Sequence, residues 1–160
     1  MFPDFRELLA SFHAHGVKYL IVGGYAVSFH AQPRATKDLD VWIKADPANA
    51  EATYAALVSF GAPLDTFTAA DLADPQKFIR FGREPVAVDI LSSIEGVDFD
   101  EAWPRRVEAV IDPKTSLHAF FISRADLIAS KIHSGRIRDL ADVEEIRHAE
   151  RATSKKPNEE

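Results

Sequence analysis

Two aspartates one residue apart, Asp38 and Asp40, lie at the start of an apolar segment, 39–43, whose composition predicts a strand. Side chains two positions apart on a strand point to the same face of a sheet, so we expect these carboxylates to lie side by side. Neighbouring carboxylates repel each other and offer the oxygen ligands that a hard divalent cation prefers. The alternative is a pair of solvated charges at the end of a strand.

A third aspartate, Asp89, lies within the β-rich apolar segment 86–91, which also predicts a strand. Because an unpaired buried carboxylate costs free energy, Asp89 needs a partner. A salt bridge to Lys77 or Arg80 is one explanation. A metal ion shared with the first two aspartates is the other.

The next feature is the pair Gly23 and Gly24, between a predicted buried strand at 17–22 and a short predicted helix at 25–31. Glycine allows the backbone to come close to a ligand, and the N–H groups of a following helix bind phosphate oxygens. Taken alone, such a pair after a strand is more often an ordinary turn.

Together these features predict phosphoryl-transfer chemistry. Three carboxylates on adjacent strands beside a glycine turn can hold two metal ions, one that activates a hydroxyl and one that binds the triphosphate and the leaving pyrophosphate. We therefore predict that Asp38, Asp40 and Asp89 are metal ligands and catalytic residues. Gly23 and Gly24 are predicted to bind the nucleotide.

The rest of the sequence supplies the elements that must position these residues. Helical periodicity and β-rich runs alternate along the chain. Further strands are predicted around 78–80, 106–111 and 117–122, and further helices at 5–12, 48–60 and, as a pair after the N-cap residue Ser123, about 123–149. This order predicts the α/β (α+β) class, with a mixed β-sheet flanked by helices and a C-terminal helical pair.

The length and composition fit one globular domain. The 160 residues are 46% hydrophobic, which excludes global disorder. We predict a single domain over 1–150 and a polar, disordered tail over 151–160. The formal net charge of −6 argues against a wholly basic nucleic-acid wrapper, although it is compatible with a local basic groove.

Several classes of site and location are excluded by the sequence. Cysteine is absent, so disulfides, thiolate zinc sites and a thiol nucleophile are excluded. The N-terminus lacks the pattern of a signal peptide, and the longest apolar runs are too short to span a bilayer. We therefore predict a cytoplasmic protein with no membrane partner.

The same residues carry a resemblance to a known superfamily. Gly23-Gly24, Asp38-x-Asp40 and Asp89 resemble the pattern of the DNA polymerase β-like nucleotidyltransferases: a Gly-Gly or Gly-Ser turn, a D-x-D or D-x-E about a dozen residues later, and an acidic residue on a later strand. The resemblance implies the mixed sheet of the nucleotidyltransferase fold. It also implies Mg²⁺ (or Mn²⁺) as cofactor and transfer of a nucleoside monophosphate (NMP) from a nucleoside triphosphate (NTP) to an acceptor hydroxyl.

A closer likeness is to the AbiEii-type branch, known from bacterial toxin–antitoxin and phage-defence systems. The residues that carry it are Arg34 and Thr36 before the aspartate pair, and Lys131, Arg138, Asp139 and Asp142 on the C-terminal helices. This likeness implies a catalytic role for Lys131. The residues for which it implies nucleotide binding are Arg34, Thr36, Arg138 and Asp139. It further implies RNA, a protein or a small molecule as the acceptor, and a cognate toxin or antitoxin as a partner.

Simpler interpretations are open for two of these residues and for the whole protein. Arg34 either holds triphosphate oxygens or is a solvated loop charge. Lys131 either points into the site or extends its ammonium group to water from an apolar helix face. The alternative to an enzyme is a nucleotide- or partner-binding module of the same fold with little or no turnover.

Overall fold

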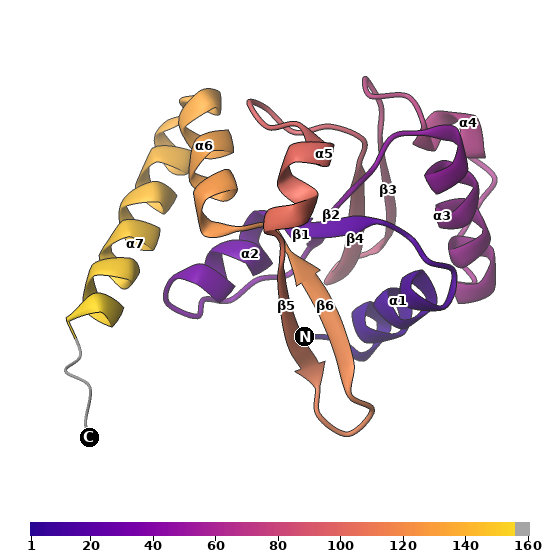
Figure 1. The fold of residues 1–160 in the computed structure, drawn as a ribbon. Coiled ribbons are helices and arrows are strands. Elements are labelled where there is room, and N and C mark those ends of the chain that lie inside the picture. Colours follow the sequence, from indigo (N-terminus) through magenta and orange to yellow (C-terminus); the bar gives the residue numbers. More distant parts are fainter. Residues whose placement is uncertain (156–160) are drawn as a thin grey trace.

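A six-stranded mixed sheet organises the computed structural model, which describes residues 1–155 (Figure 1). The strand order across the sheet is β3-β4-β2-β1-β6-β5. The strands are β1 (Tyr19–Val22), β2 (Leu39–Ile43), β3 (Phe78–Arg83), β4 (Val86–Leu91), β5 (Val107–Asp112) and β6 (Leu117–Phe121). The β2–β4 and β1–β6 pairs are parallel and the other pairs are antiparallel. The predicted mixed sheet is therefore confirmed.

Helices cover both faces of this sheet. They are α1 (Pro3–Ala14), α2 (Gly23–His30), α3 (Pro47–Phe60), α4 (Ala69–Leu72), α5 (Phe99–Ala102), α6 (Arg124–Ser134) and α7 (Ile137–Ser154), with a 3-10 turn at Trp103–Arg105. Figure 1 shows α6 and α7 side by side at one end of the molecule and α1, α3 and α4 towards the other. The predicted C-terminal helical pair is confirmed.

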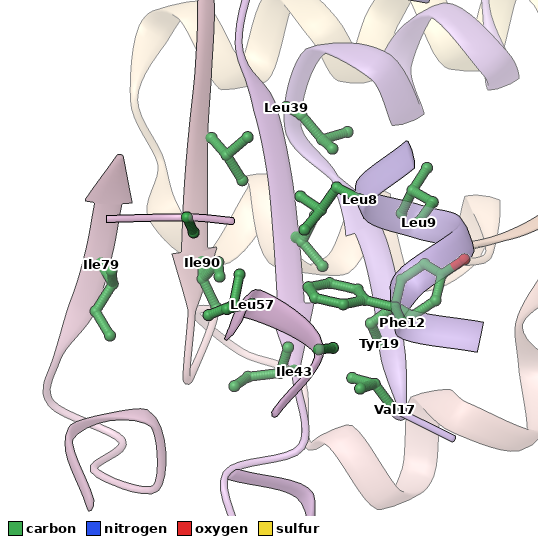
Figure 2. Close-up of a cluster of buried hydrophobic side chains, with 14 of the residues drawn as sticks. Leu8, Leu9, Phe12, Val17, Tyr19, Leu39, Ile43, Leu57, Ile79 and Ile90 are labelled. Atoms are coloured by element: carbon green, nitrogen blue, oxygen red, sulfur yellow. The ribbon is translucent and has the colours of Figure 1, made fainter. Parts of the chain in front are cut away.

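The larger core lies between the sheet and the helices α1 and α3 (Figure 2). Side chains alternate along each strand, so Leu39, Val41 and Ile43 of β2 share this face with Ile79 and Ile90. All three β2 residues are completely buried. Burial of this apolar surface is the main favourable contribution to folding and fixes which face of β2 its other residues occupy.

The intervening residues of β1 and β2 form a second core on the opposite face. Leu20, Val22 and Trp42 pack there against apolar residues of α2, α5, α6 and α7. Asp40 is two residues before Trp42 and therefore lies on the same face of β2. Asp38 immediately precedes the strand with the same parity. The aspartates consequently lie on the side of the sheet that carries the C-terminal helices.

The junction between α6 and α7 brings the C-terminal charges together. Ser123 caps α6, because its side chain accepts a hydrogen bond from the backbone N–H of Asp126 at 3.1 Å. Gly135 ends the helix in the left-handed region, with φ +66°, which glycine adopts without strain. The chain then turns back, and α7 packs against α6.

The end of α7 lies beyond the boundary that the sequence suggested. Residues 151–154 are helical, where a tail was predicted, and the hydroxyls of Thr153 and Ser154 donate to the carbonyls four residues earlier, both at 3.0 Å. The part of the predicted tail at 156–160 lies outside the described residues. Within residues 1–155, none of the helices combines the length and the apolar character needed to cross a membrane.

Candidate functional site

The strand register brings the three predicted metal ligands together. The parallel pairing of β2 and β4 places Asp40 opposite Asp89, and residues paired in this way share a face of the sheet. Asp38 is joined to them through an arginine that contacts both Asp38 and Asp89. We call Asp38, Asp40 and Asp89 the carboxylate site.

That arginine is Arg80, on the edge strand β3, where antiparallel pairing places it opposite Asp89. Its Nη1 donates to both carboxylate oxygens of Asp89, at 3.1 and 2.9 Å. Its Nη2 donates to Asp38 Oδ2 at 3.2 Å and to Glu84 Oε1 at 3.0 Å. Of the two salt-bridge partners considered for Asp89, the structure therefore contains Arg80, whereas Lys77 pairs with Asp71.

The neighbours of Asp40 strongly perturb its carboxyl group. Burial, the charges of Asp89 and Asp38 and a hydrogen bond with Asp89 raise the pKa of Asp40 to about 7, and the charge of Arg80 opposes this shift. The single positive charge of Arg80 thus leaves the carboxylate site with excess negative potential, which a further cation would relieve.

The chemistry of the carboxylate site fits a hard divalent cation. Three carboxylates are the oxygen ligands that Mg²⁺ and Mn²⁺ prefer, and Asp38 Oδ1 is a buried oxygen without a hydrogen-bond partner within residues 1–155. In the described part of the chain, however, no three His, Asp or Glu side chains are grouped closely enough to hold a metal ion as they stand. The donor set suits the metal, while the carboxylates are arranged around Arg80.

The glycine pair allows α2 to begin directly against the carboxylate site. Gly23 has φ +64°, and a side chain there would overlap the carboxyl group of Asp40. A Cβ at Gly24 would lie 2.8 Å from Thr36 Cγ2, closer than ordinary contacts permit. Close packing therefore explains why glycine occupies both positions, in addition to any role in binding a ligand.

A cleft of about 520 Å³ runs from this glycine turn to the C-terminal helices. A volume of this size is typical of small-molecule and cofactor sites. The predicted site residues that line it are Gly23, Gly24, Arg34, Asp40, Lys131, Arg138 and Asp139. Three predicted residues, Asp38, Asp89 and Thr36, are outside this lining as the described residues form it. The carboxylate site thus reaches the cleft through Asp40.

A second group of charges, on α6 and α7, forms the far wall of the cleft. The ammonium group of Lys131 donates to Asp139 Oδ1 at 3.1 Å and to Asp142 Oδ2 at 2.8 Å. Its side chain is only 12% exposed, so it does not extend to water as the simpler interpretation required. Arg34 adds a hydrogen bond to Asp142 Oδ1 at 2.9 Å. We call Lys131, Asp139, Asp142 and Arg34 the lysine network.

The carboxylates of the lysine network are more completely hydrogen-bonded than those of the carboxylate site. Although burial alone would raise it, hydrogen bonds from Ser134, Arg136 and Lys131 lower the pKa of Asp139 to about 2. For Asp142, hydrogen bonds from Arg34 and Lys131 likewise outweigh burial and lower its pKa. The carboxyl group of Asp139 is therefore already fully engaged within the protein.

Arg34 and Thr36 belong to the loop that connects α2 to β2. Thr36 Oγ1 lies 3.4 Å from Ser28 Oγ, and Tyr25 donates to the carbonyl of Thr36 at 3.3 Å, so this loop folds back on α2. Because the same loop leads into Asp38, the ion pair between Arg34 and α7 connects the carboxylate site to the lysine network.

Several residues at the cleft were missed by sequence reasoning. They are Ser93, Glu95, Ser130, Ser134 and Arg136. Ser134 and Arg136 flank Gly135, and the reversal of the chain at this glycine was the available signal. Arg138, which was predicted, is exposed and has no ion pair within residues 1–155.

Comparisons with known proteins show the family and the fold of this chain. A family model described as a nucleotidyltransferase of unknown function (DUF6036) matches residues 4–152. Among solved structures, the chain is similar to the lincosamide antibiotic adenylyltransferase LnuA bound to lincomycin, with a TM-score of 0.59 and 16% sequence identity. The match covers 93% of this chain and 98% of that chain. At this identity the likeness is one of fold, and it confirms the predicted nucleotidyltransferase fold. No curated protein sequence matches the chain, and the AbiEii-type branch stays a prediction.

Proposed function

We propose, because this chain belongs to a family of nucleotidyltransferases, that it transfers an NMP from an NTP to an acceptor hydroxyl with the help of Mg²⁺ or Mn²⁺. The observation that carries the proposal is the convergence of three aspartates on one face of the sheet beside the glycine turn. Asp38, Asp40 and Asp89 would hold the metal ion. When bound, this ion would act as a Lewis acid that activates hydroxyl and phosphate oxygens.

The cleft provides the place for the NTP. One wall is the beginning of α2 at Gly23 and Gly24, and the other is α6 and α7. Lys131 and Arg34 are held in place by buried carboxylates, so they would meet phosphate oxygens without losing rotamer freedom on binding. Arg138 is exposed at the same cleft and would add a charge that no ion pair engages within residues 1–155.

A labelling assay tests this function. The protein is incubated with each α-labelled NTP, Mg²⁺ or Mn²⁺, and separate pools of RNA, protein and small hydroxyl compounds. We expect label to enter one pool, and the Asp40→Asn variant to lose at least about a thousandfold of that activity, since it removes a ligand and a charge from the reacting centre.

The matched control is Asp65→Asn, which removes the same charge at an exposed position. It should transfer label at the wild-type rate. If Asp40→Asn transfers label as well as the control does, the carboxylate site is not the catalytic centre.

The acceptor and the biological role extend the proposal. The likeness to the AbiEii-type branch favours a cognate partner and allows RNA, a protein or a small molecule as the acceptor, while the adenylyltransferase LnuA is a fold relative described with a small antibiotic. A role as a toxin predicts that expression of the chain alone slows bacterial growth and that Asp40→Asn removes this effect. Growth unaffected by either form would count against the toxin role and leave the transferase proposal in place.

A binding module without turnover is the second candidate. The observation that favours it is the engagement of two of the three carboxylates by Arg80. On this interpretation the protein would bind an NTP in an equilibrium titration, and no acceptor pool would be labelled in the presence of either metal.

A further inference from the structure

The guanidinium of Arg80 contacts carboxylate oxygens that a metal ion at the carboxylate site would also need. It occupies both oxygens of Asp89 and one oxygen of Asp38. A guanidinium and a divalent cation on the same carboxylates repel each other, because they are like charges at contact distance. The two cations therefore compete for these ligands.

The engagement by Arg80 is incomplete. It leaves Asp38 Oδ1 buried and without a hydrogen-bond partner in the described part of the chain. Asp40 receives no hydrogen bond from Arg80 within residues 1–155, although it lies opposite Asp89. Three carboxylates thus share one guanidinium, and a doubly charged ion would neutralise them better.

The side chain of Arg80 also has room to move away from the aspartates. Arg80 lies on the edge strand β3 and its side chain is 44% exposed. Its Nη2 already donates to Glu84, whose side chain is 62% exposed at the end of the hairpin. A rotation of the arginine side chain towards Glu84 would release the aspartates without any change in the sheet.

We propose that Arg80 is an internal counter-ion of the metal-free protein, which competes with the divalent cation for Asp38 and Asp89 and is displaced when the cation binds. This inference rests on the proposed function, in which the carboxylate site holds the metal. Arg80 stabilises the carboxylate site against the mutual repulsion of its carboxylates and in return weakens metal binding.

Metal affinity is the direct test. Free Mn²⁺ is followed by electron paramagnetic resonance during titration of the protein, without nucleotide. We expect Arg80→Gln to bind Mn²⁺ roughly 3- to 30-fold more tightly than the wild type, because the ion no longer competes with the guanidinium for the carboxylates. Arg80→Lys keeps the charge but cannot contact two carboxylates as a fork, so its affinity should fall between the two.

Arg83→Gln is the matched control. Arg83 is exposed on the same strand, and no ion pair involves it within residues 1–155. The variant removes the same charge without touching the carboxylate site, so its Mn²⁺ affinity should change less than about twofold, as expected for a screened distant charge. An equal gain in Arg83→Gln would attribute the effect to net charge and overturn the proposal.

Thermal unfolding separates competition from a purely structural role. In EDTA, Arg80→Gln should unfold at a lower temperature than the wild type, since the carboxylates have lost their counter-ion. With saturating Mn²⁺ this deficit should disappear, because Arg80 no longer occupies the site in either protein. A deficit of equal size in both conditions would show that Arg80 is structural.

The outcomes also separate this inference from the proposed function. If the wild type binds Mn²⁺ and Asp40→Asn does not, but Arg80→Gln and Arg80→Lys bind no more tightly than the wild type, only the role of Arg80 is wrong. If no form of the protein binds Mn²⁺ at millimolar concentration, the proposed metal site itself fails.

Discussion

The carboxylate site and the lysine network contain similar groups on the same side of the sheet, but they shift the pKa of a carboxyl group in opposite directions. In the lysine network, hydrogen bonds from Lys131, Ser134 and Arg136 hold the pKa of Asp139 at about 2. In the carboxylate site, burial and neighbouring carboxylates raise the pKa of Asp40 to about 7. The first arrangement is complete without a ligand, whereas the second leaves negative charge uncompensated.

The difference in pKa indicates that the carboxylate site and the lysine network have different roles. A completed network holds side chains in one geometry and adds stability when all of its partners are present. An incompletely compensated carboxylate cluster lowers stability and favours any cation that can bind it. We therefore interpret the lysine network as the fixed wall and the carboxylate site as the part that changes partners.

The largest expected effect on stability comes from breaking the lysine network. Lys131→Met keeps the apolar stem but leaves Asp139 and Asp142 without their shared cation, so we expect a loss of about 3 kcal/mol in the free energy of unfolding. Urea denaturation at neutral pH measures it. Arg138→Met, on the same helical pair but exposed, should change stability by less than about 0.5 kcal/mol. Equal losses in both variants would show that the network is not a buried unit.

The next largest effect is a dependence of stability on pH. The pKa of Asp139 in the folded protein, about 2, is below the ordinary value of 3.8. A depressed folded pKa means that the ionised carboxylate stabilises the protein above pH 3.8 and that this contribution is lost as the pH falls towards 2. Asp139→Asn should therefore be less stable than the wild type at pH 6, with the difference shrinking below pH 4. A difference that stays constant from pH 6 to pH 2.5 would contradict this.

A smaller effect is expected at the glycine turn, where the two regions meet. Gly24→Ala places a methyl group 2.8 Å from Thr36 Cγ2, and such overpacking should cost about 1 kcal/mol. Adding Thr36→Ser removes that Cγ2 and should recover part of the loss, as measured by thermal unfolding. If the double variant is no more stable than Gly24→Ala, the contact with Thr36 is not the reason for glycine at this position.

The smallest effect on stability is expected at Asp40 itself. In EDTA at neutral pH, Asp40→Asn should be as stable as the wild type or more stable by about 1 kcal/mol, because it removes like-charge repulsion. Chemical denaturation beside Lys131→Met gives the comparison directly. A loss similar to that of Lys131→Met would mean that the carboxylate site is a structural network of the same kind.

The sequence alone was sufficient for the shared face of Asp38 and Asp40 and for the mixed sheet. Alternation along β2 follows from strand geometry, whereas the placement of Asp89 beside them also depends on the β2–β4 register. The choice between Arg80 and Lys77 could not be made, because it depends on the β3–β4 register that sets Arg80 opposite Asp89. A shift of one residue would have turned Arg80 to the other face.

The members of the lysine network could be predicted from the sequence, but the contacts between them could not. Lys131 and Asp139 are eight residues apart on two helices, and their contact depends on the reversal of the chain at Gly135. The sequence therefore offered a snorkelling lysine as an equal alternative. The end of α7 was also missed, since the polar residues 151–154 continue the helix through backbone and hydroxyl hydrogen bonds.

Anomalous diffraction from crystals grown with Mn²⁺ and a non-hydrolysable NTP analogue tests the metal assignment most directly. We predict a manganese peak with oxygens of Asp38, Asp40 and Asp89 at about 2.0–2.6 Å, with the side chain of Arg80 turned away from Asp38. The absence of manganese from these three carboxylates at saturating Mn²⁺, with Arg80 still bound to Asp38 and Asp89, would contradict it.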